Sequence, residues 1–231
     1  AENQYFASRD IAEAIAERML EPDPPEVVVV HPESADGWLE CVAMDPARAR
    51  LVDALKELDA HDRFHLYVPY SGETPIYVHA KLLIVDDRII RVGSANFNGR
   101  SMGLDSECDV FIDCARKANE HCEEPIRAIR HGLLAEHCGI ATDEVAQLLE
   151  AHGSMAAMIE YLDKRDGRHL RRFEMPEQGE IEQFMADNEW LNPDRAEDVI
   201  PGTSKRRRGF FRRGSLLAKG MTKLKRKTRH R

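Results

Sequence analysis

Residues 76–96 constrain the fold of this 231-residue chain more than any other stretch. The run 78–85 is apolar except at His79 and Lys81, and an Asp-Asp-Arg turn follows it. Its Val and Ile content predicts a buried strand rather than a helix. Residues 89–93 predict a second strand that returns beside the first. Because side chains alternate along a strand, we expect His79 and Lys81 to point to the same face.

Four polar side chains are expected to converge at one end of this strand pair. Ser94 and Asn96 follow the second strand, again two residues apart. An ammonium and neutral donors suit the oxygens of a phosphodiester, and an imidazole can attack phosphorus or move a proton. A single buried histidine is more often structural than catalytic. The combination with Lys81 favours chemistry on a phosphodiester.

The pattern of this region resembles the HKD signature of the phospholipase D superfamily, matched here by His79, Lys81, Asp86, Gly93, Ser94 and Asn96. Residues 2–6 are similar to a segment that these enzymes carry between two such motifs. Residues 98–109 resemble the phospholipase branch rather than the small endonuclease or cardiolipin synthase branches. The resemblance covers roughly residues 1–140. It implies an α/β fold: a phospholipase D-like α/β sandwich half, with a mixed sheet flanked by helices and a C-terminal helical extension.

The resemblance also implies residue roles. One histidine attacks phosphorus to form a phosphohistidine, and another protonates the leaving alcohol and then activates water or a second alcohol. His79 is expected to act as the acid and then the base. Glu107, 28 residues further on, is expected to hydrogen-bond His79 and fix its tautomer. The expected catalytic residues are His79, Lys81, Asp86 and Glu107, and the phosphate-binding residues are Lys81, Ser94 and Asn96.

Asp86 is expected to anchor the end of its strand rather than to contact phosphate. No cofactor and no metal are expected. The five cysteines include no Cys-x-x-Cys pair, and the ten histidines show no metal-ligand spacing. Reduced thiols suit a cytoplasmic protein.

The chain carries one HKD motif, whereas members of the superfamily build one site from two. The second motif is expected either from a missing N-terminal half or from a homodimer partner that contributes a second His79. The chain opens at Ala1 inside an expected strand, which favours the C-terminal half of a longer enzyme.

The function indicated is a phospholipase D-type phosphoric diester hydrolase that hydrolyses or transphosphatidylates glycerophospholipids. One alternative is a dimeric HKD nuclease that acts on nucleic acid, although residues 98–109 argue against it. Another is a non-catalytic half-site chain that binds membranes. The sequence does not identify the head group.

Charge is distributed unevenly along the chain. Of the 33 Lys and Arg residues, thirteen lie in residues 203–231, where there is no Asp or Glu; the other 20 face 41 acidic residues in 1–202. Apolar residues recur at helical spacing in this basic tail, which predicts peripheral binding to an anionic membrane surface. Nucleic-acid binding and a solvated tail are the alternatives.

Three regions are expected along the chain: a catalytic half-domain over 1–140, with its motif at about 73–100; a helical annex and linker over 141–202; and the tail over 203–231. Helices are predicted at 8–20, 47–60, 117–138, 142–151 and 154–163, and further strands at 27–30, 64–68 and 109–112. This order favours a mixed sheet between helices.

Two further pairs of residues are candidates for the site. His31 and Glu33 follow a strand, where sites often lie, but a loop histidine is usually solvated. Arg100 and Ser101 follow the turn at 94–96 and either line the site or begin a helix as its cap.

Overall fold

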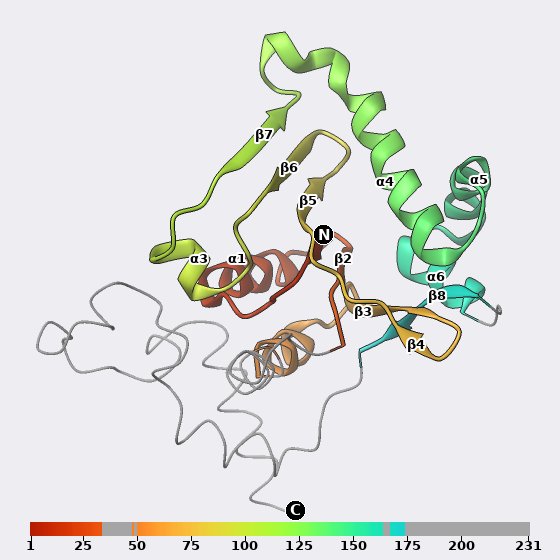
Figure 1. Cartoon of the computed structure of the whole chain (residues 1–231), viewed down its shortest axis with the longest axis horizontal. Coiled ribbons are helices and arrows are strands. Elements are labelled where there is room, and N and C mark those ends of the chain that lie inside the picture. Colours follow the sequence, from red (N-terminus) through yellow and green to blue (C-terminus); the bar gives the residue numbers. More distant parts are fainter. Residues whose placement is uncertain (34–47, 49, 164–166, 174–231) are drawn as a thin grey trace, which may run out of the picture.

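A computed structural model of the chain describes residues 1–33, 48, 50–163 and 167–173, and its centre is a mixed sheet (Figure 1). The strand order is β4-β3-β2-β1-β5-β6-β7, and β8 also pairs with β3. Only the β1–β2 and β2–β3 pairs are parallel. The strands are β1 (Glu2–Asn3), β2 (Val27–Val30), β3 (Phe64–Ser71), β4 (Thr74–Pro75), β5 (Lys81–Val85), β6 (Ile89–Gly93), β7 (Asp109–Asp113) and β8 (Arg168–Arg172).

Helices cover both faces of the parallel part of this sheet. A helix that has no label in Figure 1 contains the described residues 48 and 50–58. The expected α/β architecture, a mixed sheet flanked by helices, is confirmed. The labelled helices are α1 (Arg9–Met19), α3 (Gly99–Gly103), α4 (Glu123–Cys138), α5 (Thr142–His152) and α6 (Met155–Leu162), and a 3-10 helix occupies Lys117–Cys122.

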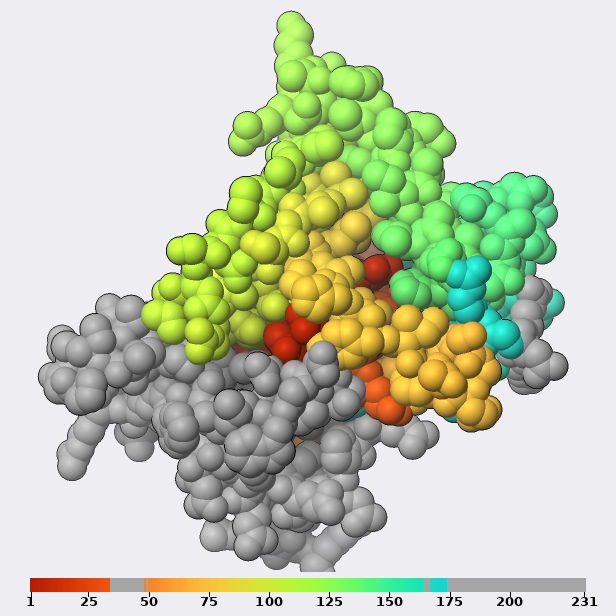
Figure 2. All heavy atoms as spheres, viewed as in Figure 1, coloured from red at the N-terminus to blue at the C-terminus, as the bar shows by residue number. Residues whose placement is uncertain are grey.

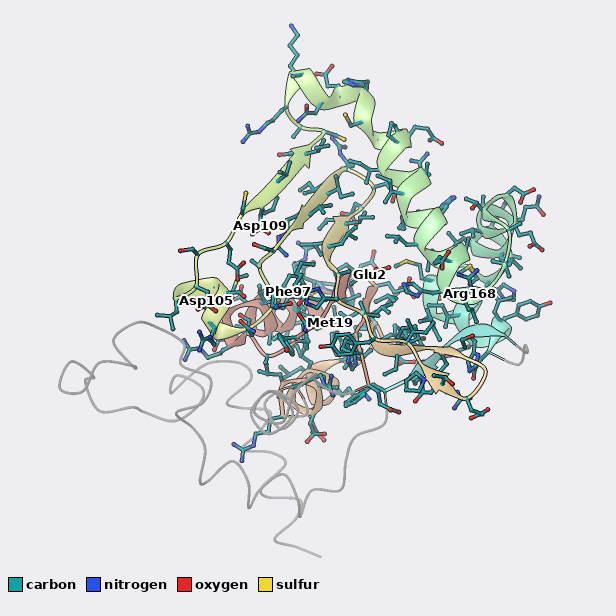
Figure 3. The ribbon with its side chains drawn as sticks, in the orientation of Figure 1. Glu2, Met19, Phe97, Asp105, Asp109 and Arg168 are labelled. Carbon is teal, nitrogen blue, oxygen red and sulfur yellow. The ribbon has the colours of Figure 1, made fainter. Side chains whose placement is uncertain are left out.

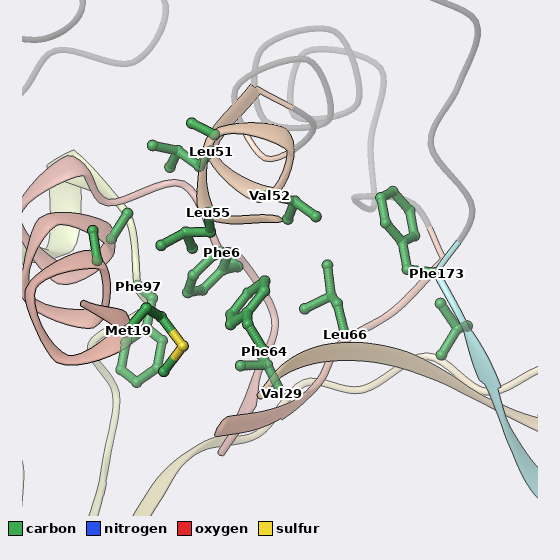
Figure 4. Packing of buried hydrophobic residues seen from close by; sticks show 14 of the residues in the cluster. Phe6, Met19, Val29, Leu51, Val52, Leu55, Phe64, Leu66, Phe97 and Phe173 are labelled. Carbon is green, nitrogen blue, oxygen red and sulfur yellow. The ribbon is translucent and has the colours of Figure 1, made fainter. Parts of the chain in front are cut away.

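The four valines of β2 show why this strand is central. Val29 packs into one core and Val28 and Val30 into another, as the two-residue period of a strand requires. A strand buried on both faces is expected to be apolar throughout, as this one is. The first core joins the sheet to α1 and to the helix at 50–58 (Figure 4); its residues include Phe6, Met19, Leu51, Leu55, Phe64, Leu66 and Phe97.

The second core lies on the opposite face, between the sheet and the helices α4, α5 and α6. Its buried residues include Tyr67, Leu134, Val145, Met158, Ile159 and Leu170. The expected helix over 117–138 is divided into a 3-10 helix and α4, and Ile129 of α4 is 43% exposed. The α4 helix ends at Gly139, whose φ of 63° suits glycine.

A helical annex and linker are expected over 141–202; α5 and α6 lie in this range, but the described residues that follow them form no helix. Residues 168–172 form β8, which pairs antiparallel with β3 from Tyr67 to Ser71. Leu170 on this strand fills the second core, so burial in the sheet outweighs the charged composition around it.

The basic tail at 203–231 lies outside the described residues. Within the described part, no helix is both long and apolar enough to span a bilayer.

Candidate active site

The β5–β6 hairpin sets the geometry of the predicted site. Leu82 pairs with Val92 and Val85 with Ile89, so the start of β5 and the end of β6 lie at the same end of the hairpin. The strand predicted over 78–85 begins only at Lys81. Its partner β1 ends at Asn3, which lies opposite Lys81. Beyond this pair the Gln4 N–H still donates to the Ala80 carbonyl, at 3.1 Å, but the regular ladder stops.

Lys81 is the buried cation of this end, with 9% of its surface exposed. Its Nζ donates to the His79 carbonyl oxygen at 2.8 Å and to Gln4 Oε1 at 2.9 Å. Burial lowers the pKa of Lys81, and the nearby Glu107 carboxylate acts in the opposite direction. The ammonium is therefore held by neutral oxygens in a partly desolvated place.

His79 lies against this ammonium and is itself exposed. Its Nδ1 and Nε2 are 3.2 and 3.3 Å from Lys81 Nζ. The Tyr77 ring lies nearly parallel to the imidazole, with centroids 6.5 Å apart and planes at 27°. If the buried Lys81 ammonium binds the oxygens of a phosphoryl group, the exposed imidazole beside it is close enough to reach the phosphorus.

Asn96 joins the cluster, whereas Ser94 is engaged elsewhere. Asn96 Nδ2 lies 3.5 Å from Gln4 Oε1, the atom that accepts from Lys81. The Ser94 hydroxyl donates to Glu107 Oε2 at 2.5 Å and accepts from the Cys108 backbone N–H at 3.0 Å. The structure thus brings His79, Lys81 and Asn96 together and places the Ser94–Glu107 pair beside them.

The expected contact between Glu107 and His79 is not formed: among the described residues, Glu107 hydrogen-bonds Ser94 instead. The physical reason is local, since the Cys108 backbone N–H fixes the Ser94 oxygen and directs its proton to the adjacent carboxylate. The Glu107 carboxylate acts to raise the pKa of Lys81, against the effect of burial.

Asp86 lies at the opposite end of the hairpin, in the turn between β5 and β6. It is exposed and has a φ of 51°. The anchoring expected of Asp86 is made by Asp87, whose carboxylate binds Arg127 at 3.2 Å and Arg130 at 2.6 Å. Both guanidiniums hold the pKa of Asp87 below its usual range, chiefly through the Arg130 hydrogen bonds. The third residue of the motif is therefore remote from the first two.

A buried ion pair fixes the turn that carries Ser94 and Asn96. Arg91 is 4% exposed and donates through Nη2 to Asp109 Oδ1 at 2.7 Å and to the Ala95 carbonyl at 2.8 Å. Gly93 leaves room for this pair, because a Cβ there would lie 1.8 Å from Asp109 Oδ1 and 2.5 Å from the Cys108 carbonyl. Figure 3 labels Asp109, which pairs with Gly93 at the end of β6, and Phe97, the residue after Asn96.

Gln4 is a site residue that the sequence reasoning did not single out. It follows β1, and its backbone N–H donates to the Ala80 carbonyl at 3.1 Å. In Figure 2 the first residues of the chain, in red, come to the surface between gold and yellow-green atoms of the motif region. The signal that could have identified it is its place in the segment 2–6, which resembles a family segment.

His31 and Glu33, which follow β2, make their hydrogen bonds outside the cluster at Lys81. His31 is fully buried, its Nδ1 lies 2.8 Å from Arg48 Nη1, and burial holds its pKa well below the usual value. Glu33 accepts from the Tyr70 hydroxyl.

The helix α3 begins at a different cap from the one expected. Asn98 caps it by accepting from the Ser101 backbone N–H, and Arg100 forms an ion pair with Asp105 at 2.9 Å.

Within the described ranges, no group of three His, Cys, Asp or Glu side chains is placed to hold a metal ion.

Comparison with known proteins agrees with the chemistry of this cluster. The family model described as Phospholipase D matches residues 49–186, more than half of the chain. Phospholipase D alpha 1 of Cynara cardunculus is 29% identical over 139 residues, which cover 58% of this chain and 16% of that protein. Phospholipase D alpha 4 of Arabidopsis thaliana is 41% identical over 73 residues, covering 31% of this chain and 9% of that protein.

The chain thus spans less than a fifth of the length of these curated relatives. Among solved structures, NucT from Helicobacter pylori matches with a TM-score of 0.32 and 18% identity, over 55% of this chain and 74% of that one. A TM-score this low supports no conclusion about fold or function.

Proposed function

This chain belongs to the phospholipase D family, and we propose that it supplies one half of a phosphodiesterase active site that cleaves phospholipids. The observation that carries the proposal is the cluster at the start of β5, where the buried Lys81 ammonium lies beside the exposed His79 imidazole. Such a pair can bind a phosphoryl oxygen and transfer a proton within the same site.

In the proposed reaction a second imidazole, from a second motif, attacks phosphorus and forms a P–N bond. The P–O bond to the head-group alcohol breaks, and His79 gives its proton to the departing oxygen. In the second step His79 takes a proton from water, whose oxygen attacks phosphorus, and the P–N bond breaks. Lys81 and Asn96 stabilise the charge on the phosphoryl oxygens in both steps.

Phospholipids are proposed as the substrate because the relatives reported above carry the name phospholipase D. An alcohol that replaces water in the second step gives transphosphatidylation with the same residues. The second motif comes either from further polypeptide or from a second copy of this chain, in which case the site contains two His79 residues.

The test measures the mass of the chain in solution and its turnover of phosphatidylcholine vesicles and of single- and double-stranded DNA on the same fractions. Lipid turnover by a dimer, lost in His79→Ala and retained in His61→Ala, supports the proposal with two copies of His79. His61 is a matched control because it is an exposed histidine outside the cluster. Turnover of DNA in place of lipid contradicts the proposed substrate.

An inactive monomer calls for the same assay on the chain joined to a polypeptide with a second HKD motif. The covalent step is then tested by trapping the intermediate on the enzyme, since a phosphorylated histidine is labile in acid and stable in base. Absence of both lipid turnover and phosphohistidine in the completed site contradicts the proposal and favours the non-catalytic alternative.

The basic tail at 203–231 is proposed to hold the protein on anionic lipid. Each basic residue near such a surface contributes about 1 kcal/mol to binding. Sedimentation with vesicles that contain or lack phosphatidylserine, for the whole chain and for residues 1–202, tests this directly. Equal binding of the two forms would contradict it.

A further inference from the structure

We propose that Gln4 is a positioning residue of this site, whose amide oxygen fixes the Lys81 ammonium and the Asn96 amide relative to each other. The inference rests on the proposed function for its catalytic meaning, and on the geometry of β1 for its structural basis. Gln4 is 6% exposed and comes from a segment more than 70 residues away from Lys81 in the chain.

The backbone places Gln4 between the two segments of the motif. Its N–H donates to the Ala80 carbonyl at 3.1 Å, which ties it to the residues just before β5. The neighbouring Asn3 accepts through Oδ1 from the Phe97 N–H at 2.9 Å, which ties the same strand to the turn after β6. These two hydrogen bonds fix the backbone at Gln4, so the position of its side chain is set even without the contacts that the side chain makes.

The chemistry of Lys81 determines how the Gln4 amide is oriented. An ammonium only donates hydrogen bonds, so the atom 2.9 Å from Nζ is the amide oxygen. The amide nitrogen then faces the Tyr77 and Tyr5 hydroxyl oxygens, to which it donates at 2.7 and 3.2 Å. Since both ends of the amide are engaged, rotation of this side chain would break hydrogen bonds at both ends.

The same oxygen orients Asn96. Asn96 Nδ2 is directed at Gln4 Oε1, and Asn96 Oδ1 is buried without a partner among the described residues. A flip of the Asn96 amide would place its Oδ1 against Gln4 Oε1, and repulsion between the two carbonyl oxygens disfavours this arrangement. The Lys81 ammonium has three N–H groups. Two are donated to Gln4 and the His79 carbonyl, and the third faces the His79 ring nitrogens, 3.2 and 3.3 Å from Nζ, at the place where a phosphoryl oxygen is proposed to bind.

The test replaces Gln4 by two residues of similar size. Gln4→Glu puts a negative charge beside the ammonium and should raise the pKa of Lys81. Gln4→Met removes the acceptor and should lower it further below its usual value. An NMR titration of 13Cε-labelled lysine, with the Lys81 signal assigned by Lys81→Arg, measures both directions. The other titratable groups near the ammonium are His79, Glu107, Tyr5 and Tyr77, which both variants retain.

In the completed enzyme, Gln4→Met should reduce kcat/KM about tenfold, the effect of one hydrogen bond to a charged group, and Gln4→Glu should shift the alkaline limb of the pH profile upward. Asn3→Ala is the matched control. It removes a buried amide from the same strand that contacts the Phe97 and Tyr5 backbones but not Lys81. It should lower the thermal midpoint, because the Phe97 N–H loses its acceptor, and shift the pKa of Lys81 by less than either Gln4 variant does.

The inference is overturned if the Lys81 pKa is the same in folded Gln4→Glu, Gln4→Met and the unmodified chain, or if Asn3→Ala shifts it as much. The titration needs no turnover. A Lys81 pKa that responds to Gln4 in a chain without phosphodiesterase activity would therefore contradict the proposed function alone and retain the positioning role.

Discussion

The two ends of the β5–β6 hairpin are both charged, but they balance their charge in different ways. At the turn, the Asp87 carboxylate is bound by the guanidiniums of Arg127 and Arg130 from α4. At the opposite end, Lys81 is hydrogen-bonded to neutral oxygens, and in the described part of the chain no carboxylate forms an ion pair with it. The adjacent Glu107 is hydrogen-bonded to Ser94.

This difference separates charge that stabilises the fold from charge that is available to a ligand. A carboxylate between two guanidiniums is neutralised and joins a helix to the sheet. A buried ammonium held only by dipoles loses solvation without gaining a counter-ion, which costs stability and leaves it ready to bind an anion.

Replacing Lys81 by Met should have the largest effect on activity and little effect on stability. Loss of the cation should lower turnover of the completed enzyme about 1,000-fold, the upper range for removing one electrostatic contact to a transition state. The free energy of unfolding should stay level or rise, because a desolvated charge is removed. Turnover and thermal denaturation measure the two effects.

Lys117→Met, at an exposed lysine of the 3-10 helix, is the control and should change neither quantity. A large loss of stability in Lys81→Met would show that the ammonium is part of the framework, and the contrast between the two ends would not hold.

Gly93→Ala should be the most destabilising of these substitutions, by roughly 3 kcal/mol. The new methyl group would overlap Asp109 Oδ1 and the Cys108 carbonyl, so β6 and β7 would have to separate and the Arg91–Asp109 pair would be strained. Urea denaturation measures the loss. Gly132→Ala on α4, with no atom within 4 Å of its new Cβ, should instead stabilise by about 0.5–1 kcal/mol.

Asp87→Asn should lower the free energy of unfolding by about 2 kcal/mol at neutral pH and leave turnover per folded molecule unchanged. Solvent screens the Arg127 charge, because that side chain is 39% exposed, and this limits the loss. The folded-state pKa of Asp87 is depressed, so its contribution is present above the unfolded pKa of about 3.9 and is lost as the pH falls through the folded value. The gap in thermal midpoint between the two proteins should therefore close in acid.

A gap that stays constant from pH 7 to pH 3 would contradict the assigned charge state of Asp87. A fall in turnover that parallels the fall in stability would show that the turn end also serves the chemistry.

The elements with a clear period were predictable from the sequence, and the contacts between distant segments were not. The four valines of β2 and the alternation in the motif strands indicated a buried sheet correctly. The strand β8 was missed because its burial depends on pairing with β3, a contact across about 100 residues. Gln4 was missed as a site residue for the same reason, since only the β1–β5 pairing brings it to Lys81.

The motif spacing identified His79, Lys81 and Asn96 as neighbours but could not assign hydrogen bonds within the cluster. Glu107 was expected to hydrogen-bond His79, but it accepts a hydrogen bond from Ser94, because the Cys108 backbone N–H fixes the Ser94 oxygen. The sequence likewise does not show which of the adjacent Asp86 and Asp87 forms an ion pair, because this depends on where α4 packs.

Asp86→Asn should have the smallest effect, although Asp86 is the third residue of the motif. Its side chain is exposed and lies at the turn end, and both Asp86 and Asp87 have positive φ in a turn closed by the Arg88 N–H and the Val85 carbonyl. Asparagine tolerates this conformation as well as aspartate does. Stability should change by less than about 0.5 kcal/mol and turnover by less than about twofold. Measured beside Asp87→Asn, a tenfold loss of turnover in folded Asp86→Asn would overturn the separation of the two ends, because the turn would then act on the site without touching it.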